Sequence, residues 1–448
     1  MTAMSAKKSL LFYLGLSHVM VACIPSSSMQ PDHTPAEQDF VTVRNEHFVL
    51  GQERYAFVGA NYWYGPHLAA QGVEGRKRVE QDLDQLQSLG IRNLRILAGS
   101  EGPSDAPWRI APAMQESPGQ YNQALLEGLD FVLQALAKRG MHAVLFLTNY
   151  WFWSGGLAQY LAWHEGSSIP YPFNEGQDWQ SFSNYTSRFF EHAQAQQSLR
   201  DHIAFIINRR NTLSHLYYRD DPAIMAWELC NEARGMNQAM AMQRWVDQSA
   251  CFIKSLDPRH LVTTGSEGDS AAPKAHGLDF INDHKSSCID YATMHLWVEN
   301  WGWFDPKKQQ KSFNSAKKQA LRYITQHIDG AKKLGKPIVL EEFGIARDFG
   351  SFDPQSPALL RSAYYSTVLD AIYKAAFRHP HVGGSNFWAW GGQISLENNY
   401  GEPWQPEQNL SADPPHEPQG WYSVFSHEKQ TLDVLKNYAE RMTRLKSY

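Results

Sequence analysis

Two glutamates stand at the ends of short apolar runs that are typical of buried β-strands. Glu232 comes three residues after the run 223–229, and Glu342 ends the run 337–342. If such strands form a parallel barrel, the residues at their carboxyl ends face one common pocket. A facing pair of carboxyl groups supplies a proton donor and a nucleophile, which cleavage of a glycosidic bond with retention requires. We therefore take Glu232 and Glu342 as the candidate catalytic pair.

The elements that must position this pair are a series of alternating strands and helices. Helical stripes such as Val79, Leu83, Leu86 and Leu89 separate the apolar runs. An open doubly wound sheet would carry a glycine-rich turn after its first strand, and Ala60-Asn61-Tyr62-Trp63 has none. The sequence therefore predicts an α/β fold, a (β/α)8 barrel, with strands near 55–61, 91–97, 141–148, 223–229, 260–264, 289–296, 337–342 and 383–388.

Composition narrows the class of protein further. The 448 residues carry a net charge of -5 and no Lys/Arg-rich run, so nucleic acid is not expected as a partner. One domain over 39–448 accounts for the rest of the chain. Aromatic residues make up 13%, and many fall in the long connections 150–180 and 296–315, after the third and sixth strands. Indole rings stack on sugar rings, so these connections are expected to be substrate walls.

The first 38 residues have the features of an export signal and a tether. Residues 1–22 contain two lysines and a short apolar run and predict a signal peptide. Residues 19–23 resemble a bacterial lipobox, which would make Cys23 the lipidated first residue and 23–38 a flexible tether. The expected location is the outer membrane of a bacterium, on the cell surface or the periplasmic side. An ordinary cleaved signal peptide is the alternative.

Three further cysteines, Cys230, Cys251 and Cys288, lie in apolar stretches. An odd number cannot all pair. Buried free thiols are the expected state, and one disulfide among them is the alternative.

Two segments carry a resemblance to a known family. Trp-Glu-Leu-Cys-Asn-Glu at 227–232 and Pro-Ile-Val-Leu-Glu-Glu-Phe-Gly at 337–344 resemble the strand-four and strand-seven signatures of glycoside hydrolase family 5. The resemblance implies that Glu232 is the acid/base, that Glu342 is the nucleophile and that Asn231 binds the sugar 2-hydroxyl. Retention then predicts carboxyl groups about 5 to 5.5 Å apart. It also predicts a raised pKa for Glu232.

Other strand ends agree with this family pattern. The resemblance implies that Arg95 supports the nucleophile, that His295 lies beside the carboxylates and that Trp388 forms the floor under the sugar. The departure is Trp297, where the family usually has a tyrosine that hydrogen-bonds the nucleophile. Indole can donate a hydrogen bond but has no phenolic hydroxyl. This departure puts the hydrogen bonding of the nucleophile in question.

Within the family, residues 221–229, 264–268 and 148–151 look like the β-mannanase branch. This implies β-mannan or manno-oligosaccharides as substrate and adds Glu267, Trp151 and Trp163 as candidate substrate contacts. The aromatic connections and the tether favour exo action. A β-1,4-glucanase of the same family and a non-catalytic carbohydrate-binding lipoprotein are the alternatives. The mechanism needs no cofactor, and the histidines lack metal-ligand spacing such as His-Glu-x-x-His.

Two more glutamates lie in the same strands and need a different explanation. Glu228 and Glu341 are expected to have structural pairing roles. Strand alternation should point Glu341 away from the side that Glu342 faces.

Overall fold

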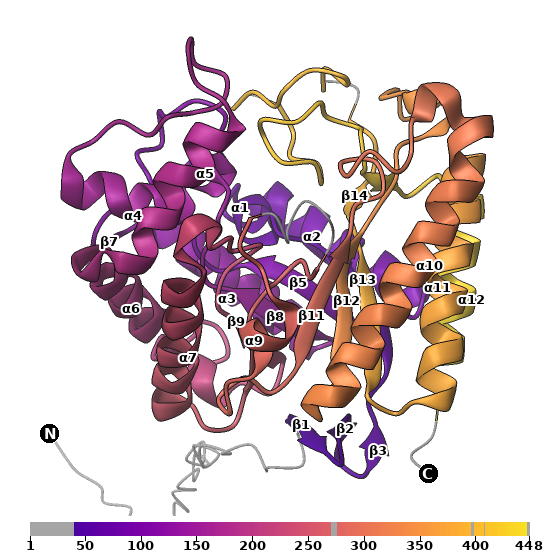
Figure 1. Cartoon of the computed structure of the whole chain (residues 1–448), viewed down its shortest axis with the longest axis horizontal. Coiled ribbons are helices and arrows are strands. Elements are labelled where there is room, and N and C mark those ends of the chain that lie inside the picture. The colour runs from indigo at the N-terminus through magenta and orange to yellow at the C-terminus, as the bar shows by residue number, and fades with distance from the viewer. Residues whose placement is uncertain (1–39, 270–275, 396–397, 407, 446–448) are drawn as a thin grey trace, which may run out of the picture. The chain divides into compact units, whose positions relative to one another are not determined.

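The computed structural model describes residues 40–445 except 270–275, 396–397 and 407. The signal peptide and the tether with Cys23 therefore lie outside the described residues. All eight expected strands are present (Figure 1). They are β4 (Phe57–Asn61), β5 (Asn93–Leu97), β8 (His142–Phe146), β9 (Ile224–Glu228), β10 (Leu261–Thr263), β11 (Ala292–Leu296), β12 (Ile338–Phe343) and β13 (Val382–Phe387).

The eight strands form one parallel sheet in the order β10-β9-β8-β5-β4-β13-β12-β11. This order follows the chain around a ring, as a barrel requires. Between β10 and β11, bonds outside the strand ladder bring the two ends of the sheet together. The Asp290 amide donates to the Val262 carbonyl at 2.8 Å, and the Thr263 hydroxyl donates to the Tyr291 carbonyl at 2.9 Å. The predicted (β/α)8 barrel is confirmed.

Helices with an apolar stripe separate the strands. In α2 (Val73–Ser88) the predicted residues Val79, Leu83 and Leu86 are all buried. Gly90 follows with a φ of 77°, a left-handed conformation that lets the chain turn into β5. The other helices are α1 (Gly65–Ala69), α3 (Gln123–Ala137), α4 (Gly156–Glu165), α5 (Trp179–Ser187), α6 (Ala193–Ile207), α7 (Ala239–Leu256), α9 (Phe280–His284), α10 (Gln309–Leu334), α11 (Leu359–Arg378) and α12 (Lys429–Thr443). Within the described ranges, none of these helices is long and apolar enough to cross a membrane.

A small antiparallel sheet that the sequence did not predict covers the amino-terminal end of the barrel. It consists of β1 (Val41–Arg44), β2 (His47–Leu50) and β3 (Glu53–Arg54), seen at the lower end in Figure 1. The Phe48 ring meets Tyr291 edge-on at 5.2 Å and lies where a side chain at Gly383 would project. This end is therefore filled, and the opposite end is left for a site.

Two of the three cysteines are joined, contrary to the expectation of free thiols. Cys251 of α7 forms a disulfide with Cys288, which precedes β11, and Cys230 is free and buried. The alternative left open by the odd count is therefore the correct one. Apolar neighbours do not distinguish a buried thiol from a buried disulfide.

Two long segments lie at the carboxyl ends of the strands. The expected loop 150–180 contains helical structure: a 3-10 turn, Phe152–Ser154, and α4. A second segment, residues 393–423, connects β14 (Trp390–Gly392) to β15 (Val424–Phe425) and was not singled out from the sequence. Figure 1 shows the described residues of this segment in yellow above the upper ends of the strands. We call residues 393–423 the strand-eight loop.

Candidate active site

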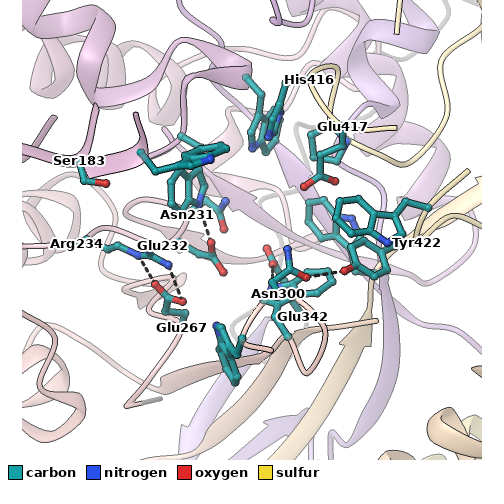
Figure 2. A pocket seen from close by; sticks show the side chains of 18 of the residues that line it. Ser183, Asn231, Glu232, Arg234, Glu267, Asn300, Glu342, His416, Glu417 and Tyr422 are labelled. Atoms are coloured by element: carbon teal, nitrogen blue, oxygen red, sulfur yellow. Dashed lines mark hydrogen bonds and ion pairs between the residues drawn. The ribbon is translucent and has the colours of Figure 1, made fainter. Parts of the chain in front are cut away.

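The carboxyl ends of the strands open into a cavity of about 600 Å³. Arg95 and His295 are fully buried beneath it. Figure 2 shows Glu232 and Glu342 facing each other across the cavity. The predicted residues that line it are Trp151, Asn231, Glu232, Glu267, Trp297, Glu342 and Trp388.

Glu232 is held by its backbone and by both carboxylate oxygens. Its φ of 51° is in the left-handed region, which is unusual for a residue other than glycine and is often found at functional sites. Its amide donates to the Gly265 carbonyl at 2.9 Å. Oε1 lies 2.6 Å from His295 Nδ1, and Oε2 accepts the Trp151 indole N–H at 2.7 Å. Both oxygens therefore have a hydrogen-bond partner on the protein.

Glu342 is also contacted on both oxygens. The Arg95 guanidinium donates to Oε1, and the Trp297 indole donates to Oε2 at 3.1 Å. His295 Nδ1 lies 3.3 Å from Oε2 as well. The indole N–H of Trp297 thus makes a hydrogen bond to the nucleophile candidate in spite of the missing tyrosine.

His295 stands between the two candidate carboxylates. One oxygen of Glu232, one oxygen of Glu342 and one ring nitrogen of His295 all lie within 4.8 Å of one another. These three residues come from β12, from β11 and from the segment after β9. The barrel thus brings together groups that are more than 40 residues apart in sequence.

Arg95 organises the carboxylates from below. Its Nε and Nη2 donate to Glu228 at 2.7 and 2.5 Å, and Nη2 also donates to Asn231 Oδ1 at 2.8 Å. Its Nη1 donates to Glu342 and to Asn61. The structural pairing expected for Glu228 is therefore present. Arg95 also fixes the amide of Asn231, whose Oδ1 is engaged with the guanidinium.

Glu341 does not point away from its neighbour, as strand alternation predicted. The β11–β12 register pairs Met294 with Leu340 and then His295 with Glu342, so Glu341 is an extra residue in a β-bulge. Its Oε2 lies 3.9 Å from His295 Nε2 and 4.0 Å from Arg95 Nε. The bulge directs both glutamates toward the same buried cations.

The direction of the Glu232 pKa is opposite to the prediction. Burial raises it, but the hydrogen bond and charge of His295, the charge of Arg234 and the Trp151 N–H together bring it down to about 2. His295 is the reason: burial lowers its pKa, yet the surrounding carboxylates raise it to about 10. The pKa of Glu342 is raised, because burial and the charge of Glu232 outweigh His295 and Arg95. These opposite shifts favour a proton on His295 over one on Glu232.

Glu267 contacts the acid/base region through an arginine that the sequence analysis did not name. Arg234 donates to its two carboxylate oxygens at 2.6 and 3.1 Å. The guanidinium also lies 4.7 Å from the centre of the Trp151 ring. The position of Arg234, two residues after Glu232, was a signal that could have identified it.

Trp163 is the candidate that the structure does not bring into the cavity. It lies on α4, where its half-buried ring packs edge-on against Tyr160 at 5.3 Å. The lining of the cavity therefore gives no support to its predicted contact with substrate, and the contact that the structure shows is packing. Trp163 lies in the helix Gly156–Glu165, which was not recognised because 150–180 was treated as one loop.

The strand-eight loop contributes a wall that sequence reasoning missed. His416, Glu417, Trp421 and Tyr422 line the cavity, and Figure 2 shows His416 and Glu417 above the two catalytic candidates. The His416 ring lies 5.0 Å from Phe152 and 6.1 Å from Trp179, both in the segment after β8. Burial and nearby acids raise the pKa of Glu417 well above its usual value. The two loops therefore meet over one side of the cavity.

Comparisons with known proteins agree with this geometry. The sequence pattern of the group described as GH family 5 beta-mannosidase-like matches residues 38–447. Mannan endo-1,4-beta-mannosidase 5 of Solanum lycopersicum is 32% identical over 395 residues, 85% of this chain and 87% of that protein. The structure of a glycoside hydrolase family 5 mannosidase from Rhizomucor miehei superposes with a TM-score of 0.83 at 35% identity, covering 92% of this chain and 99% of that one. A variant of that mannosidase, solved with mannosyl-fructose, superposes equally well, with 35% identity and coverage of 91% and 98%.

Proposed function

Since the chain belongs to glycoside hydrolase family 5, in its β-mannosidase-like group, we propose that it hydrolyses β-1,4-mannosidic linkages with retention. The observation that carries the proposal is the spacing of Glu232 and Glu342, since one carboxylate oxygen of each lies within 4.8 Å of the other. Retaining enzymes hold their carboxyl groups about 5 to 5.5 Å apart, whereas inverting enzymes leave roughly 6.5 to 9.5 Å for a water molecule. The short spacing supports direct attack by a carboxylate.

In this mechanism Glu342 attacks the anomeric carbon while the bond to the leaving oxygen breaks, and the Glu232 carboxyl delivers the proton to that oxygen. A water molecule then attacks the glycosyl ester, gives its proton to Glu232 and releases Glu342. Arg95 and the Trp297 N–H stabilise the Glu342 carboxylate when it is free. The proposed reaction itself uses neither a cofactor nor a metal ion.

Asn231 is suited to hold the sugar at the reacting carbon. Its Oδ1 accepts from Arg95, which orients the amide. One of its two N–H groups donates to Asn149 at 3.1 Å. The second can donate to the sugar 2-hydroxyl, a contact that strengthens as the ring becomes oxocarbenium-like. Trp388 lines the cavity as the aromatic floor.

Mannose is the proposed sugar because of the family group and the names of the relatives. Glucose differs from mannose in the orientation of the 2-hydroxyl, so a β-1,4-glucanase is the second candidate. The complete set of carboxylates, Asn231 and Arg95 supports catalysis over simple carbohydrate binding.

We further propose exo action on manno-oligosaccharides. The strand-eight loop meets the segment after β8 through His416, so one side of the cavity is walled. Glu417 places a half-buried carboxyl group on this wall, facing the cavity (Figure 2). A carboxyl group can accept hydrogen bonds from sugar hydroxyls and, when protonated, can also donate one. A closed end that binds hydroxyl groups favours the terminal residue of a chain over its interior.

Export and lipid anchoring at Cys23 remain part of the proposal. The Cys251–Cys288 disulfide supports export, because disulfides form and persist in oxidising compartments such as the periplasm. The outer membrane of a bacterium is the proposed location.

Product analysis by chromatography tests these proposals. Purified protein without its first 23 residues is incubated with mannohexaose and, separately, with cellohexaose. Early release of mannose supports exo action, and mannobiose with longer fragments would favour endo action. Cleavage of cellohexaose alone would replace mannan by glucan, and cleavage of neither would refute the enzymatic proposal. Glu342→Ala serves as the inactive control.

A further inference from the structure

Two buried polar atoms face each other beneath the site. His295 Nε2 and Glu341 Oε2 are 3.9 Å apart, and neither has a hydrogen-bond partner among the described residues. Both side chains are almost completely buried. An unsatisfied polar atom in such a place is unfavourable, so a small adjustment that joins these two atoms is favoured. The other ring nitrogen of His295 is already engaged with Glu232.

We propose that Glu341 is a positioning residue for proton delivery: it accepts the Nε2 proton of His295 and thereby leaves Nδ1 to exchange the catalytic proton with Glu232. Glu341, His295 and Glu232 then form a relay of carboxylate, imidazole and carboxyl group. The inference rests on the proposed function, because the proton that it supplies is the one given to the leaving oxygen.

The relay requires the tautomer with the proton on Nε2. A neutral imidazole carries one N–H, and which nitrogen holds it depends on the partner of each. If Nε2 keeps its proton against Glu341, Nδ1 presents a lone pair to Glu232 after each proton transfer. If Nδ1 kept the proton, His295 could not take one back from Glu232. A carboxylate behind the imidazole thus decides the direction of exchange, as it does in catalytic triads.

The proton balance closes over one turnover. The Nδ1 proton moves to the Glu232 carboxylate and from there to the glycosidic oxygen, while Glu342 bonds to the anomeric carbon and the bond to the leaving oxygen breaks. His295 is then neutral, with Nε2–H facing Glu341. When water attacks the ester, its proton passes to Glu232 and on to Nδ1, and Glu342 leaves as a carboxylate. The starting state is restored.

Charged and titratable groups surround Glu341 on every side. Those that face it are Arg95 of β5, Glu228 of β9, Tyr291 before β11, His295 of β11 and its neighbour Glu342. Burial and the charge of Glu228 raise its pKa to about 7, against the effects of His295 and Arg95. Glu341 is therefore ionised above neutral pH, where the proton on His295 needs the support of its negative charge.

The test is Glu341→Gln, assayed by kcat/KM against pH on two aryl β-mannosides. One has a poor leaving group that needs a proton, and the other releases dinitrophenolate, which does not. The basic limb is the fall of kcat/KM at high pH. For the substrate with the poor leaving group, we expect its apparent pKa to decrease by about 1 to 3 units, the range for loss of an adjacent opposite charge. Since His295 has a pKa of about 10, a fall of about two units means a loss of about tenfold at pH 9. Below about pH 6 the two enzymes should converge, because Glu341 is itself protonated there.

The dinitrophenyl substrate separates positioning from structural damage. Its kcat/KM in Glu341→Gln should stay within about twofold of wild type, since acid catalysis contributes little to it. Equal losses on both substrates at every pH, or an unmoved basic limb, would overturn the proposal. Glu101→Gln is the matched control: Glu101 is also buried with a pKa raised to about 7, but it accepts bonds from Gly156 and Thr148. That control should show no dependence on the leaving group.

A second measurement uses the wild-type protein, so it does not depend on the folding of Glu341→Gln. The ring nitrogens of His295 are observed by ¹⁵N NMR in the wild-type protein and assigned with His295→Gln. We expect Nε2 to stay protonated through the basic limb, and a neutral ring protonated at Nδ1 would overturn the inference. Wild-type protein inactive on both aryl β-mannosides would refute the proposed exo action instead, and the NMR result would still decide the Glu341 contact.

Discussion

The indole N–H of Trp297 is one of two protein groups that hydrogen-bond Glu342, and it can be removed with little change in shape. Trp297→Phe keeps an aromatic ring between Trp388 and Tyr422, whose rings lie 5.9 and 5.0 Å away. A hydrogen bond to a charged group contributes about 1.5 to 3 kcal/mol. One pKa unit corresponds to about 1.4 kcal/mol. Because the bond favours the ionised carboxylate, its loss should raise the pKa of Glu342 by about 1 to 2 units.

The sign of the effect follows from the role of Glu342. The nucleophile must be ionised, so kcat/KM rises as pH passes through its pKa, and Trp297→Phe should move this acidic limb upward. A dinitrophenyl β-mannoside isolates the limb, because its leaving group needs no acid. Trp297→Tyr, which restores a donor, is the matched control and should return the limb toward wild type. An unmoved limb in folded Trp297→Phe would refute the reasoning, and a uniform loss at all pH values would indicate a packing defect.

Three other predictions follow from the site and the fold. Glu232→Ala should lose about 10² to 10⁴-fold in kcat/KM on a substrate with a poor leaving group but far less on a dinitrophenyl glycoside. Glu342→Ala should be inactive on both substrates. Similar losses of Glu232→Ala on the two substrates would argue against Glu232 as the acid. His416→Ala should open the wall and shift early products of mannohexaose from mannose to longer fragments, and an unchanged chromatogram would argue against a closed end. Replacing Cys251 and Cys288 by Ala removes a link across 37 residues and should cost about 4 kcal/mol of unfolding free energy in denaturant titration; no loss of stability would mean that the denatured state is not restricted by the link.

The barrel was predictable because its strands are short apolar runs set between helices with clear periodicity. Each run is buried in a parallel sheet and therefore reads as continuous rather than alternating. The catalytic candidates could be found for the same reason, since they stand at the ends of these runs. Family motifs added Arg95, His295 and Trp388, whose strand-end positions the sheet brings to one pocket.

The strand-eight loop was not predictable in the same way. His416 and Glu417 belong to a segment without helical or strand periodicity, so no pattern indicates which of its side chains turn inward. Their place depends on contacts with Phe152 and Trp179, more than 200 residues earlier in the chain. Such contacts are tertiary and leave no local signal.

The orientation of Glu341 and the pKa of Glu232 were predicted wrongly, each for a specific physical reason. A one-residue bulge in β12 overrides the alternation on which the orientation of Glu341 was based. The Glu232 prediction considered only burial and the charge of Glu342, both of which raise a carboxyl pKa. It did not include a histidine that three carboxylates keep protonated. Where several titratable groups share one site, the position of the proton depends on all of them.

The tryptophan at 297 and the glutamate at 341 bear on the same question of where the catalytic proton is held. A tyrosine beside the nucleophile has an ionisable hydroxyl, whereas an indole N–H only donates. With Trp297 in place, His295 is an ionisable group whose Nδ1 lies 2.6 Å from Glu232 and 3.3 Å from Glu342. The control of its tautomer then rests on Nε2, which faces Glu341. If this argument holds, Trp297→Tyr should leave the nucleophile well bonded yet make the basic limb less sensitive to Glu341→Gln, because a second ionisable donor would contact the same pair of carboxylates.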